Sequence, residues 1–260
     1  MKTKSTATGF VLCLTGFAMF LFSCQKEPAT SKITDQNISN SVESLKAHLA
    51  AWYKFTKGNT ADFSGNNNHL TGYNVTSATD YLGRPKNAFY FDGSTSYMTA
   101  LNSPSLNPSS ISLVVLIKPM GYYTGFPPTS RILMKGVDDQ SSGDYFMGLN
   151  NTGSFYGTFG DNQFQSNSIN SADNLIQLNN WYKLVYTYDA GVGKLYKNDT
   201  LVGKSKQVAT FTANTDYLRI GTTGRPDYPY WFNGVIDEIR IYNVALTAAQ
   251  VANVDADLGQ

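Results

Sequence analysis

The sequence predicts an all-β domain in which two sheets pack face to face and a short helix follows. Three observations predict this class. Short stretches rich in Val, Ile, Tyr and Phe recur from residue 48 onward, clusters of Gly, Asn, Asp, Ser and Pro separate them, and a single segment has the pattern of a helix. Many short strands and one terminal helix within residues 48–260 indicate a two-sheet sandwich or a jelly roll.

Residues 1–23 have the pattern of a signal peptide. A basic start precedes the apolar run "GFVLCLTGFAMFLF", which is short for a membrane span and is followed at once by polar residues. The run ends in "LFSC", which resembles a bacterial lipobox. We therefore expect Cys24 to carry acyl chains that anchor the protein to a membrane without spanning it. A free secreted protein and an uncleaved anchor are the alternatives.

Residues 24–47 are polar and predict a tether between this anchor and the domain. The start "QKE" after Cys24 resembles the signals that send lipoproteins of some Gram-negative bacteria to the surface, so the expected location is the cell envelope, at the outer membrane or cell surface. The only cysteines are Cys13 and Cys24, which predicts a domain without disulfides. A net charge of +1 without a basic patch argues against nucleic acid as a partner.

The strands follow from runs of β-branched and aromatic residues between turn clusters. We expect them at 49–55, 87–93, 96–100, 111–119, 131–136, 144–150, 153–160, 181–189, 193–199, 205–211, 217–222 and 235–242. The helix is expected in "LTAAQVANV", where Thr247 and Gln250 have the spacing of a capping box.

Five stretches, taken in order, resemble the laminin-G-like, concanavalin A-like jelly-roll domains. They are "DFSGNNNHLTG", "NAFYFDGSTSYM", "SLVVLIKP", "WYKLVYTYDAGVGKLYKNDTLVG" and "FNGVIDEIRIYNVALTAAQV". The resemblance implies a two-sheet concanavalin A-like jelly-roll sandwich with a short C-terminal helix over residues 48–260. It also implies that the closing strand, 235–242, pairs with residues 49–55 and 87–93. This superfamily contains both endo-glucanases and carbohydrate-binding lectin modules.

Catalysis is not expected. Glucanases of this shape carry Glu-x-Asp-x-x-Glu on one strand, and the sequence lacks that triplet. Glu238 is the only Glu in residues 48–260, and its alternation with Arg240 predicts a surface ion pair. His69, in an Asn-rich loop, is expected to be a structural turn residue. Neither an elbow serine nor a nucleotide-binding fingerprint is present in the sequence.

Asp237 lies on the expected closing strand. Strict alternation would place it on one face with Val235, Ile239 and Ile241, an apolar face with a single carboxylate. Such a carboxylate needs hydrogen bonds, a cation or water. The resemblance implies a structural calcium ion, with Asp237 as a carboxylate ligand, Gly93 as a backbone ligand and Asp62 as a second carboxylate. The alternatives are that Asp237 accepts backbone N–H bonds and that Asp62 closes an Asx-turn.

Two loops combine aromatic rings with polar side chains, as sugar sites do. "GRPDYPYWFNG" offers Arg225, Asp227, Tyr228 and Tyr230, whereas "MGYYTGFPPTSR" offers Tyr122 and Tyr123. A third, weaker candidate is "GDNQFQSN". The alternative for each loop is that its aromatic rings pack beneath it, which we expect for Trp231 and Phe232.

These observations together predict a surface-anchored, non-catalytic lipoprotein that recognises a carbohydrate, either a polysaccharide or a glycan. A module that binds an extracellular protein, for adhesion or as a scaffold, is the alternative. A glycoside hydrolase or polysaccharide lyase of the same fold is the third interpretation.

Overall fold

The computed structural model describes residues 45–136, 144–160, 168–206 and 211–255, which belong to one compact unit, Thr34–Gln260. The expected signal peptide, Cys24, nearly all of the tether, and residues 161–167 of the third candidate loop lie outside the described residues. Within the described ranges, no helix is both long enough and apolar enough to cross a membrane.

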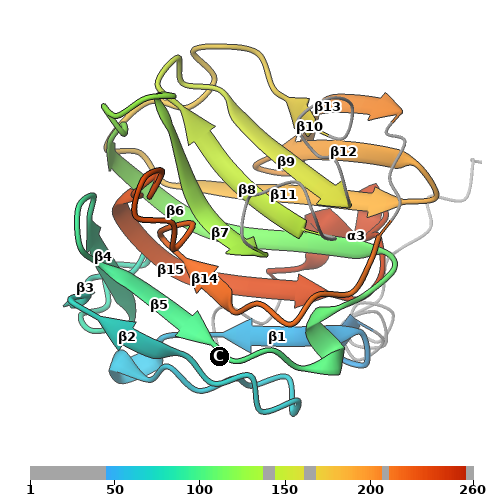
Figure 1. Cartoon of the computed structure of the whole chain (residues 1–260), viewed down its shortest axis with the longest axis horizontal. Helices are drawn as coiled ribbons and strands as arrows, with labels where there is room; N and C mark the ends of the chain where they lie inside the picture. The colour runs from blue at the N-terminus through green and yellow to red at the C-terminus, as the bar shows by residue number, and fades with distance from the viewer. Residues whose placement is uncertain (1–44, 137–143, 161–167, 207–210, 256–260) are drawn as a thin grey trace, which may run out of the picture. The chain divides into compact units, whose positions relative to one another are not determined.

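The strands form two antiparallel sheets, and Figure 1 shows the seven-stranded sheet in front of the eight-stranded one. The seven-stranded sheet has the order β10 (Ser168–Asn170), β9 (Phe155–Gly160), β8 (Asp144–Asn150), β7 (Thr129–Lys135), β14 (Leu218–Ile220), β5 (Tyr97–Ala100) and β2 (Thr71–Tyr73). The eight-stranded sheet has the order β13 (Thr200–Lys206), β12 (Val192–Lys197), β11 (Tyr182–Asp189), β6 (Ile111–Gly121), β15 (Asn233–Tyr242), β4 (Ala88–Asp92) and β3 (Thr76–Ala78), and β1 (Leu49–Tyr53) also pairs with β15. The predicted jelly-roll sandwich is confirmed.

The core lies between the two sheets and follows the alternation of strand residues. On β5 and β14, for example, Met98, Ala100, Leu218 and Ile220 point inward and belong to the main apolar cluster. The alternating residues of the same strands therefore point away from the core. This outward set forms the outer face of the seven-stranded sheet.

The closing strand β15 holds the two ends of the domain together. One edge of it pairs with β6. Its other edge pairs first with β4, where Ile236 lies opposite Phe89, and then with β1, where Ile239 lies opposite Tyr53. The predicted pairing of the closing strand with 49–55 and 87–93 is confirmed.

The predicted side-chain alternation along β15 is wrong at Asp237. The pairing with β6 shifts register between Ile236 and Glu238, which is a β-bulge with one extra residue. Because of this bulge, Ile236, Ile239 and Ile241 all reach the core. Asp237 is therefore not a carboxylate within an otherwise apolar core face.

The other differences concern short elements. Three-residue strands β2, β3 and β10 were not expected, because so few residues carry little pattern. The strand expected at 205–211 overlaps β13, Thr200–Lys206, only at Ser205 and Lys206, and residues 207–210 of that prediction lie outside the described residues. Two 3₁₀ turns, Thr56–Gly58 and Pro104–Leu106, lie in the connections.

A second apolar cluster covers the outer face of the eight-stranded sheet. Helix α3 (Ala248–Asn253) contributes Val251 to it, and Trp52 and Tyr242 contribute from β1 and β15. The predicted capping box is confirmed, since Thr247 and Gln250 each bond to the other's backbone N–H. One face of the sandwich is therefore closed by the C-terminal segment.

Candidate functional site

The outer face of the seven-stranded sheet carries a row of aromatic rings. Tyr97 and Thr99 alternate with the inward residues of β5 and so point outward. Tyr73 of β2 lies opposite Tyr97, and the two rings stack with centroids 4.5 Å apart at 12°. Trp231, just before β15, lies 6.1 Å from Tyr97 at 47°. We call Tyr73, Tyr97 and Trp231 the ring row.

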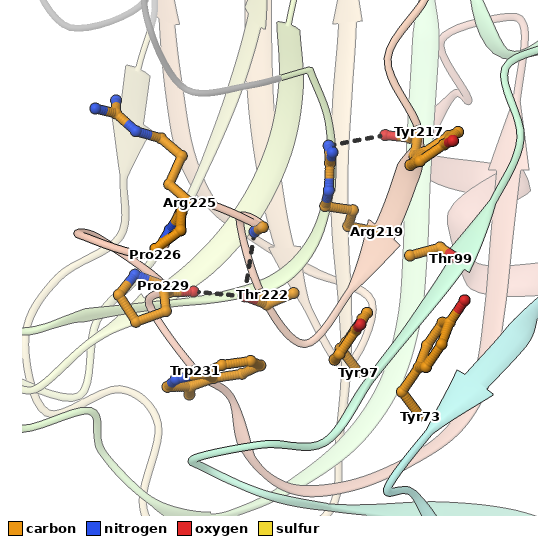
Figure 2. Close-up of a pocket in the computed structure, with 11 residues that line it drawn as sticks. Tyr73, Tyr97, Thr99, Tyr217, Arg219, Thr222, Arg225, Pro226, Pro229 and Trp231 are labelled. Atoms are coloured by element: carbon orange, nitrogen blue, oxygen red, sulfur yellow. Dashed lines mark hydrogen bonds between the residues drawn. The ribbon is translucent and has the colours of Figure 1, made fainter.

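The ring row lines a cavity of about 450 Å³, which we call the ring-row cavity. Figure 2 shows the three rings along one side, with Arg219 and Tyr217 on the opposite side. Arg225 lies beside the cavity, and Thr99 adds a hydroxyl. The cavity thus combines flat apolar rings with hydrogen-bond donors, which is how proteins hold a sugar ring.

Loop 222–230 is fixed to the sheet by backbone acceptors. The hydroxyl of Thr222 donates to the carbonyl of Pro229 at 2.8 Å, and the hydroxyl of Thr223 donates to the carbonyl of Tyr228 at 2.7 Å. The N–H of Arg131 donates to the carbonyl of Tyr230 at 2.8 Å. The cavity wall formed by this loop is therefore braced before any ligand arrives.

Gly224 gives Arg219 its space in the ring-row cavity. Its φ of +79° is in the left-handed region that favours glycine, and a Cβ added there would lie 2.3 Å from Arg219 Nε. The Arg219 guanidinium donates to the carbonyl of Gly136 at 2.9 Å. These contacts hold a cationic group at the cavity wall.

The four residues predicted from the "GRPDYPYWFNG" loop have different positions. Arg225 lines the ring-row cavity, and Tyr228, 41% exposed, has its ring 5.3 Å from the Arg225 guanidinium carbon. Asp227 is exposed on the same loop. Tyr230 is only 6% exposed, and its ring lies 4.8 Å from the guanidinium carbon of Arg131. Tyr230 therefore supports the loop from below.

The two residues predicted from the second loop also act as supports. The Tyr122 hydroxyl donates to the carbonyl of Ile176 at 2.7 Å. Tyr123 packs edge-on against Tyr230, with centroids 6.0 Å apart. Neither residue is among those that line the ring-row cavity.

Sequence reasoning missed most of the ring-row cavity. Trp231, expected to pack beneath its loop, lines the cavity with Tyr73, Tyr97, Tyr217 and Arg219. A signal was present for two of these. Tyr97 alternates with Met98, and Arg219 lies between Leu218 and Ile220, so both had to point away from the core.

Two further cavities lie on the same outer face. One, of about 550 Å³, shares Tyr73, Thr99 and Tyr217 with the ring-row cavity and adds amides such as Asn66 and Asn102. The other, of about 490 Å³, lies over β7 to β10. An elongated ligand could therefore extend from the ring row in at least one direction.

Asp237 lies between the part of β15 that pairs with β4 and the part that pairs with β1. Its Oδ2 accepts the N–H of Tyr81 at 3.1 Å, so the predicted alternative, a backbone N–H bond, is present. The pKa of Asp237 is raised to about 7. Burial is the main cause, the Tyr81 N–H and Arg84 lower the pKa, and the neighbouring carboxylates of Asp80 and Glu238 raise it.

The three candidate calcium ligands are not brought to one point. Asp62 closes an Asx-turn, and its two oxygens accept N–H groups from Trp52, Ser64 and Asn68 and the Ser64 hydroxyl. Gly93 follows Asp92, and Asp92 lies opposite Asn233 of β15. Asn233 precedes Asp237 by four residues, which corresponds to roughly 13 Å along the strand. Within the described ranges, no three His, Cys, Asp or Glu side chains cluster as a metal site. Of the two candidate carboxylates, Asp62 has donors on both oxygens, whereas among the described residues a single donor, the Tyr81 N–H, reaches Asp237.

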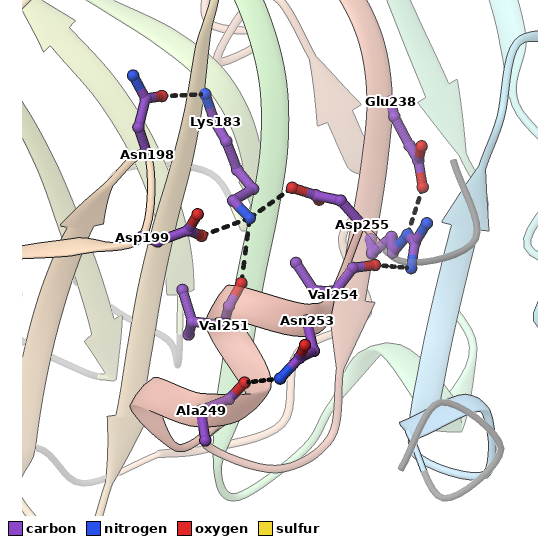
Figure 3. Close-up of polar contacts among 10 residues, drawn as sticks. Lys183, Asn198, Asp199, Glu238, Ala249, Val251, Asn253, Val254 and Asp255 are labelled. Atoms are coloured by element: carbon purple, nitrogen blue, oxygen red, sulfur yellow. Dashed lines mark hydrogen bonds and ion pairs between the residues drawn. The ribbon is translucent and has the colours of Figure 1, made fainter. Parts of the chain in front are cut away.

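The Glu238–Arg240 ion pair is present, but it is buried rather than at the surface. Only 7% of Glu238 and 5% of Arg240 are exposed, because β1 and the C-terminal segment cover them. Trp52 Nε1 donates to Glu238 Oε1 at 2.6 Å, and Arg240 also donates to the carbonyl of Val254 (Figure 3). The Glu238 carboxylate is thus part of the contacts that hold the C-terminal segment.

His69 is a structural residue, as predicted. Its Nδ1 accepts the N–H of Asp62 at 3.0 Å and so stabilises the Asn-rich loop.

Comparison with known proteins agrees with this architecture. The structure is similar to the binding domain of botulinum neurotoxin serotype D, with a TM-score of 0.65 and 20% identity over 84% of this chain and 53% of that one. It is similar to a botulinum neurotoxin type C structure, whose cell entry depends on interaction with two ganglioside molecules, with a TM-score of 0.66 and 15% identity over 83% and 52%. This chain spans about half the length of these neurotoxin chains.

A smaller protein matches over nearly its whole length. Domain 4 of AbnA, a GH43 extracellular arabinanase from Geobacillus stearothermophilus in complex with arabinotriose, has a TM-score of 0.57 and 23% identity over 82% of this chain and 99% of that one. Identities this low show the fold alone. No curated protein matches the chain in sequence. Residues 92–252, more than half of the chain, match the family model of the Concanavalin A-like lectin/glucanases superfamily, and the chain therefore belongs to this superfamily.

Proposed function

We propose that the domain is a non-catalytic carbohydrate-binding module whose ligand stacks on the ring row. The observation that carries this proposal is the set of three rings from separate segments, Tyr73, Tyr97 and Trp231, that line one cavity on the outer face. The C–H faces of a sugar ring pack on such rings, and Arg219 and the Thr99 hydroxyl are placed to bond its hydroxyl groups. The neurotoxin with its gangliosides and the arabinanase domain with arabinotriose support a glycan ligand for this fold.

The non-catalytic role is supported by the distribution of carboxylates. Glycoside hydrolysis uses two carboxyl groups on either side of the scissile bond. None of the described residues that line the ring-row cavity is Asp or Glu. The carboxylate of Glu238 bonds to Trp52 and Arg240 on the other sheet. We therefore expect the domain to release no reducing sugar or unsaturated product from the glycans that it binds.

Calorimetric titration with a glycan selected on a glycan array tests this proposal. Tyr97→Ala and Trp231→Ala should each weaken binding about tenfold or more, since each removes one stacking surface. Phe63→Ala is the matched control, because Phe63 is also an exposed ring but packs near Trp52 at the eight-stranded sheet. Ring-row variants that bind as tightly as the wild type would refute the proposed site.

We further propose that acyl chains on Cys24 anchor this module to the cell envelope. The lipobox-like "LFSC" and the polar residues that follow support this proposal. Metabolic labelling with an alkyne fatty acid should mark the wild type and leave Cys24→Ser unmarked and released from the membrane fraction. Equal labelling of both proteins would contradict it.

A further inference from the structure

A second cavity on the outer face adjoins the ring-row cavity. It has a volume of about 550 Å³, and it shares Tyr73, Thr99 and Tyr217 with the ring-row cavity. We call it the amide cavity, because Asn67 and Asn102 line it away from these shared residues. None of its described lining residues is Asp, Glu, Lys or Arg. A ligand that extends from the ring row across the shared residues therefore enters a polar site without these charged side chains.

The two cavities follow one another along β5. Thr71 of β2 lies opposite Thr99 of β5, and both share the outward face with the stacked rings of Tyr73 and Tyr97. Leu101, which lines the amide cavity just after β5, is four residues from Tyr97, which corresponds to roughly 13 Å along the strand. This span is longer than one sugar ring. The outer face therefore has room for two or more linked sugars in line.

The loop that lines the amide cavity is fixed to β1. The Asn66 amide donates to the carbonyl of Leu49 and the Asn68 amide donates to the carbonyl of Ala50, both at 2.8 Å. The Ser103 hydroxyl donates to Asn68 Oδ1 at 2.6 Å and so joins the segment after β5 to the same loop. The wall of the amide cavity is therefore braced before a ligand binds.

Asn67 lies between these two structural asparagines and differs from both. Its φ of +59° is in the left-handed region, which Asn and Gly tolerate, and its side chain is exposed. Within the described part of the chain, its side-chain amide has no hydrogen-bond partner. An amide has two donor hydrogens and an acceptor oxygen, which complement the hydroxyl groups of a sugar. Asn67 therefore offers these groups to a ligand in the amide cavity.

Other neutral groups of the amide cavity are also available to a ligand. The side-chain hydroxyls of Thr71 and Thr99 have no partner among the described residues. His69 Nδ1 accepts the N–H of Asp62 at 3.0 Å, so the hydrogen of the neutral imidazole is on Nε2, which is left as a donor. The ring of Tyr217, which is 46% exposed, adds an apolar surface. This combination of a flat ring with uncharged donors and acceptors suits a neutral sugar.

Resting on the proposed glycan-binding function, we propose that the domain binds a neutral oligosaccharide or polysaccharide chain, with one sugar on the ring row and the next sugar in the amide cavity. Stacking on Tyr97 and Trp231 requires no charge on the ligand. In the amide cavity, Asn67, Thr71 and His69 bond to the hydroxyl groups of the second sugar. Binding therefore depends on the length of the chain as well as on the sugar at the ring row.

The experiment uses ladders of neutral oligosaccharides, from the monosaccharide to the hexasaccharide, built from glucose, galactose, mannose, xylose or arabinose. A glycan array that carries these ladders beside uronate-containing and sulfated glycans selects the class that binds. Calorimetry then measures the longer members, and titration followed by nuclear magnetic resonance measures the weakly bound monosaccharide. We expect the tetrasaccharide to bind about tenfold or more tightly than the monosaccharide, because only the longer chain reaches the amide cavity.

Variants assign this gain to the amide cavity. Asn67→Gly removes the amide and keeps a residue that tolerates the left-handed φ, so the loop should remain folded. It should weaken tetrasaccharide binding about threefold to tenfold and leave monosaccharide binding unchanged. Thr71→Val should have the same selective effect, because it removes one hydroxyl and keeps the branched shape. Trp231→Ala should weaken binding of both ligands.

Asn179→Gly is the matched control. Asn179 is also exposed, has a φ of +66°, and lines neither the ring-row cavity nor the amide cavity. This variant should bind both ligands as tightly as the wild type. Circular dichroism should show that every variant is folded.

Three results would overturn the inference and leave the proposed function in place. The first is a monosaccharide that binds as tightly as the tetrasaccharide. The second is wild-type affinity for the tetrasaccharide in both Asn67→Gly and Thr71→Val, while Trp231→Ala loses binding. The third is an array on which acidic glycans alone bind. A blank array would refute the proposed function together with the inference.

Discussion

Replacing Glu238 by Gln should destabilise the domain strongly, because it removes the charge of one partner in a buried ion pair. The Glu238 and Arg240 side chains are 8% and 6% exposed, and solvent therefore screens their attraction little. Gln keeps an oxygen that can accept from Trp52 Nε1, so the main loss is the counter-charge of Arg240. Breaking a buried pair in this way costs about 3–5 kcal/mol, which for a domain of this size is roughly 6–20 °C in Tm.

Urea unfolding, followed by tryptophan fluorescence and far-ultraviolet circular dichroism, measures this loss. The double variant Glu238→Gln with Arg240→Met should lose about 2 kcal/mol less than the sum of the single variants, because it buries no charge without a counter-charge. Arg84→Met is the control. Arg84 pairs with the buried Asp80 but is itself 45% exposed. Asp80 keeps the N–H bonds of Leu82 and Arg84 and the Asn87 amide, so the loss of the Arg84 charge should cost about 1 kcal/mol or less. A cost for Glu238→Gln no larger than that for Arg84→Met would refute the burial argument.

Three further predictions concern Asp237 and the helix. The folded-state pKa of Asp237, about 7, exceeds the ordinary value of 3.8, so the contribution of Asp237 to stability is full below about pH 4 and is lost as the pH rises to 7. Asp237→Asn should abolish this dependence of stability on pH and should stabilise the domain at pH 8 by at most about 4 kcal/mol. Unfolding measured across this pH range in the presence of chelator tests both effects. A slope that persists in Asp237→Asn would contradict the assignment. Calcium binding stays a prediction: millimolar calcium should raise the Tm of the wild type but not of Asp237→Asn, and a melt that is unchanged at every chelator concentration would contradict it. Thr247→Ala removes the N-cap of α3 and should cost about 0.5–2 kcal/mol in urea unfolding, whereas no loss would show that the cap is dispensable.

The pairing of the closing strand could be predicted because five stretches, taken in order, resemble the laminin-G-like domains, in which the closing strand pairs with the start of the domain. The bulge could not be predicted, because strict alternation of side chains along the strand predicts that Asp237 points toward the core. In retrospect, the spacing of Ile236, Ile239 and Ile241 carries the signal. A step of three residues followed by a step of two fits a strand with one extra residue, and it removes the carboxylate from the core face.

The ring row could not be predicted from one segment. Tyr73 comes from a three-residue strand, Tyr97 from a second strand and Trp231 from the residues before β15. Only the register between β2 and β5, together with the return of the chain after β14, brings these rings together. Sequence reasoning therefore chose the loop with most aromatic residues, in which it identified Arg225 of the cavity lining but misjudged the role of Trp231.

The two outer faces of the sandwich have opposite characters, and this difference is the strongest physical reason to place ligand binding on one of them. On the eight-stranded sheet, helix α3 covers Trp52 and Tyr242, and the Lys183 amine bonds to Asp199, Asp255 and the carbonyl of Val251 (Figure 3). On the seven-stranded sheet, aromatic rings of comparable size line open cavities within the described part of the chain. Aromatic surface left in contact with water forgoes the stabilisation that burial brings, so the contrast between the covered face and the open face supports the proposed placement of the ligand on the open one.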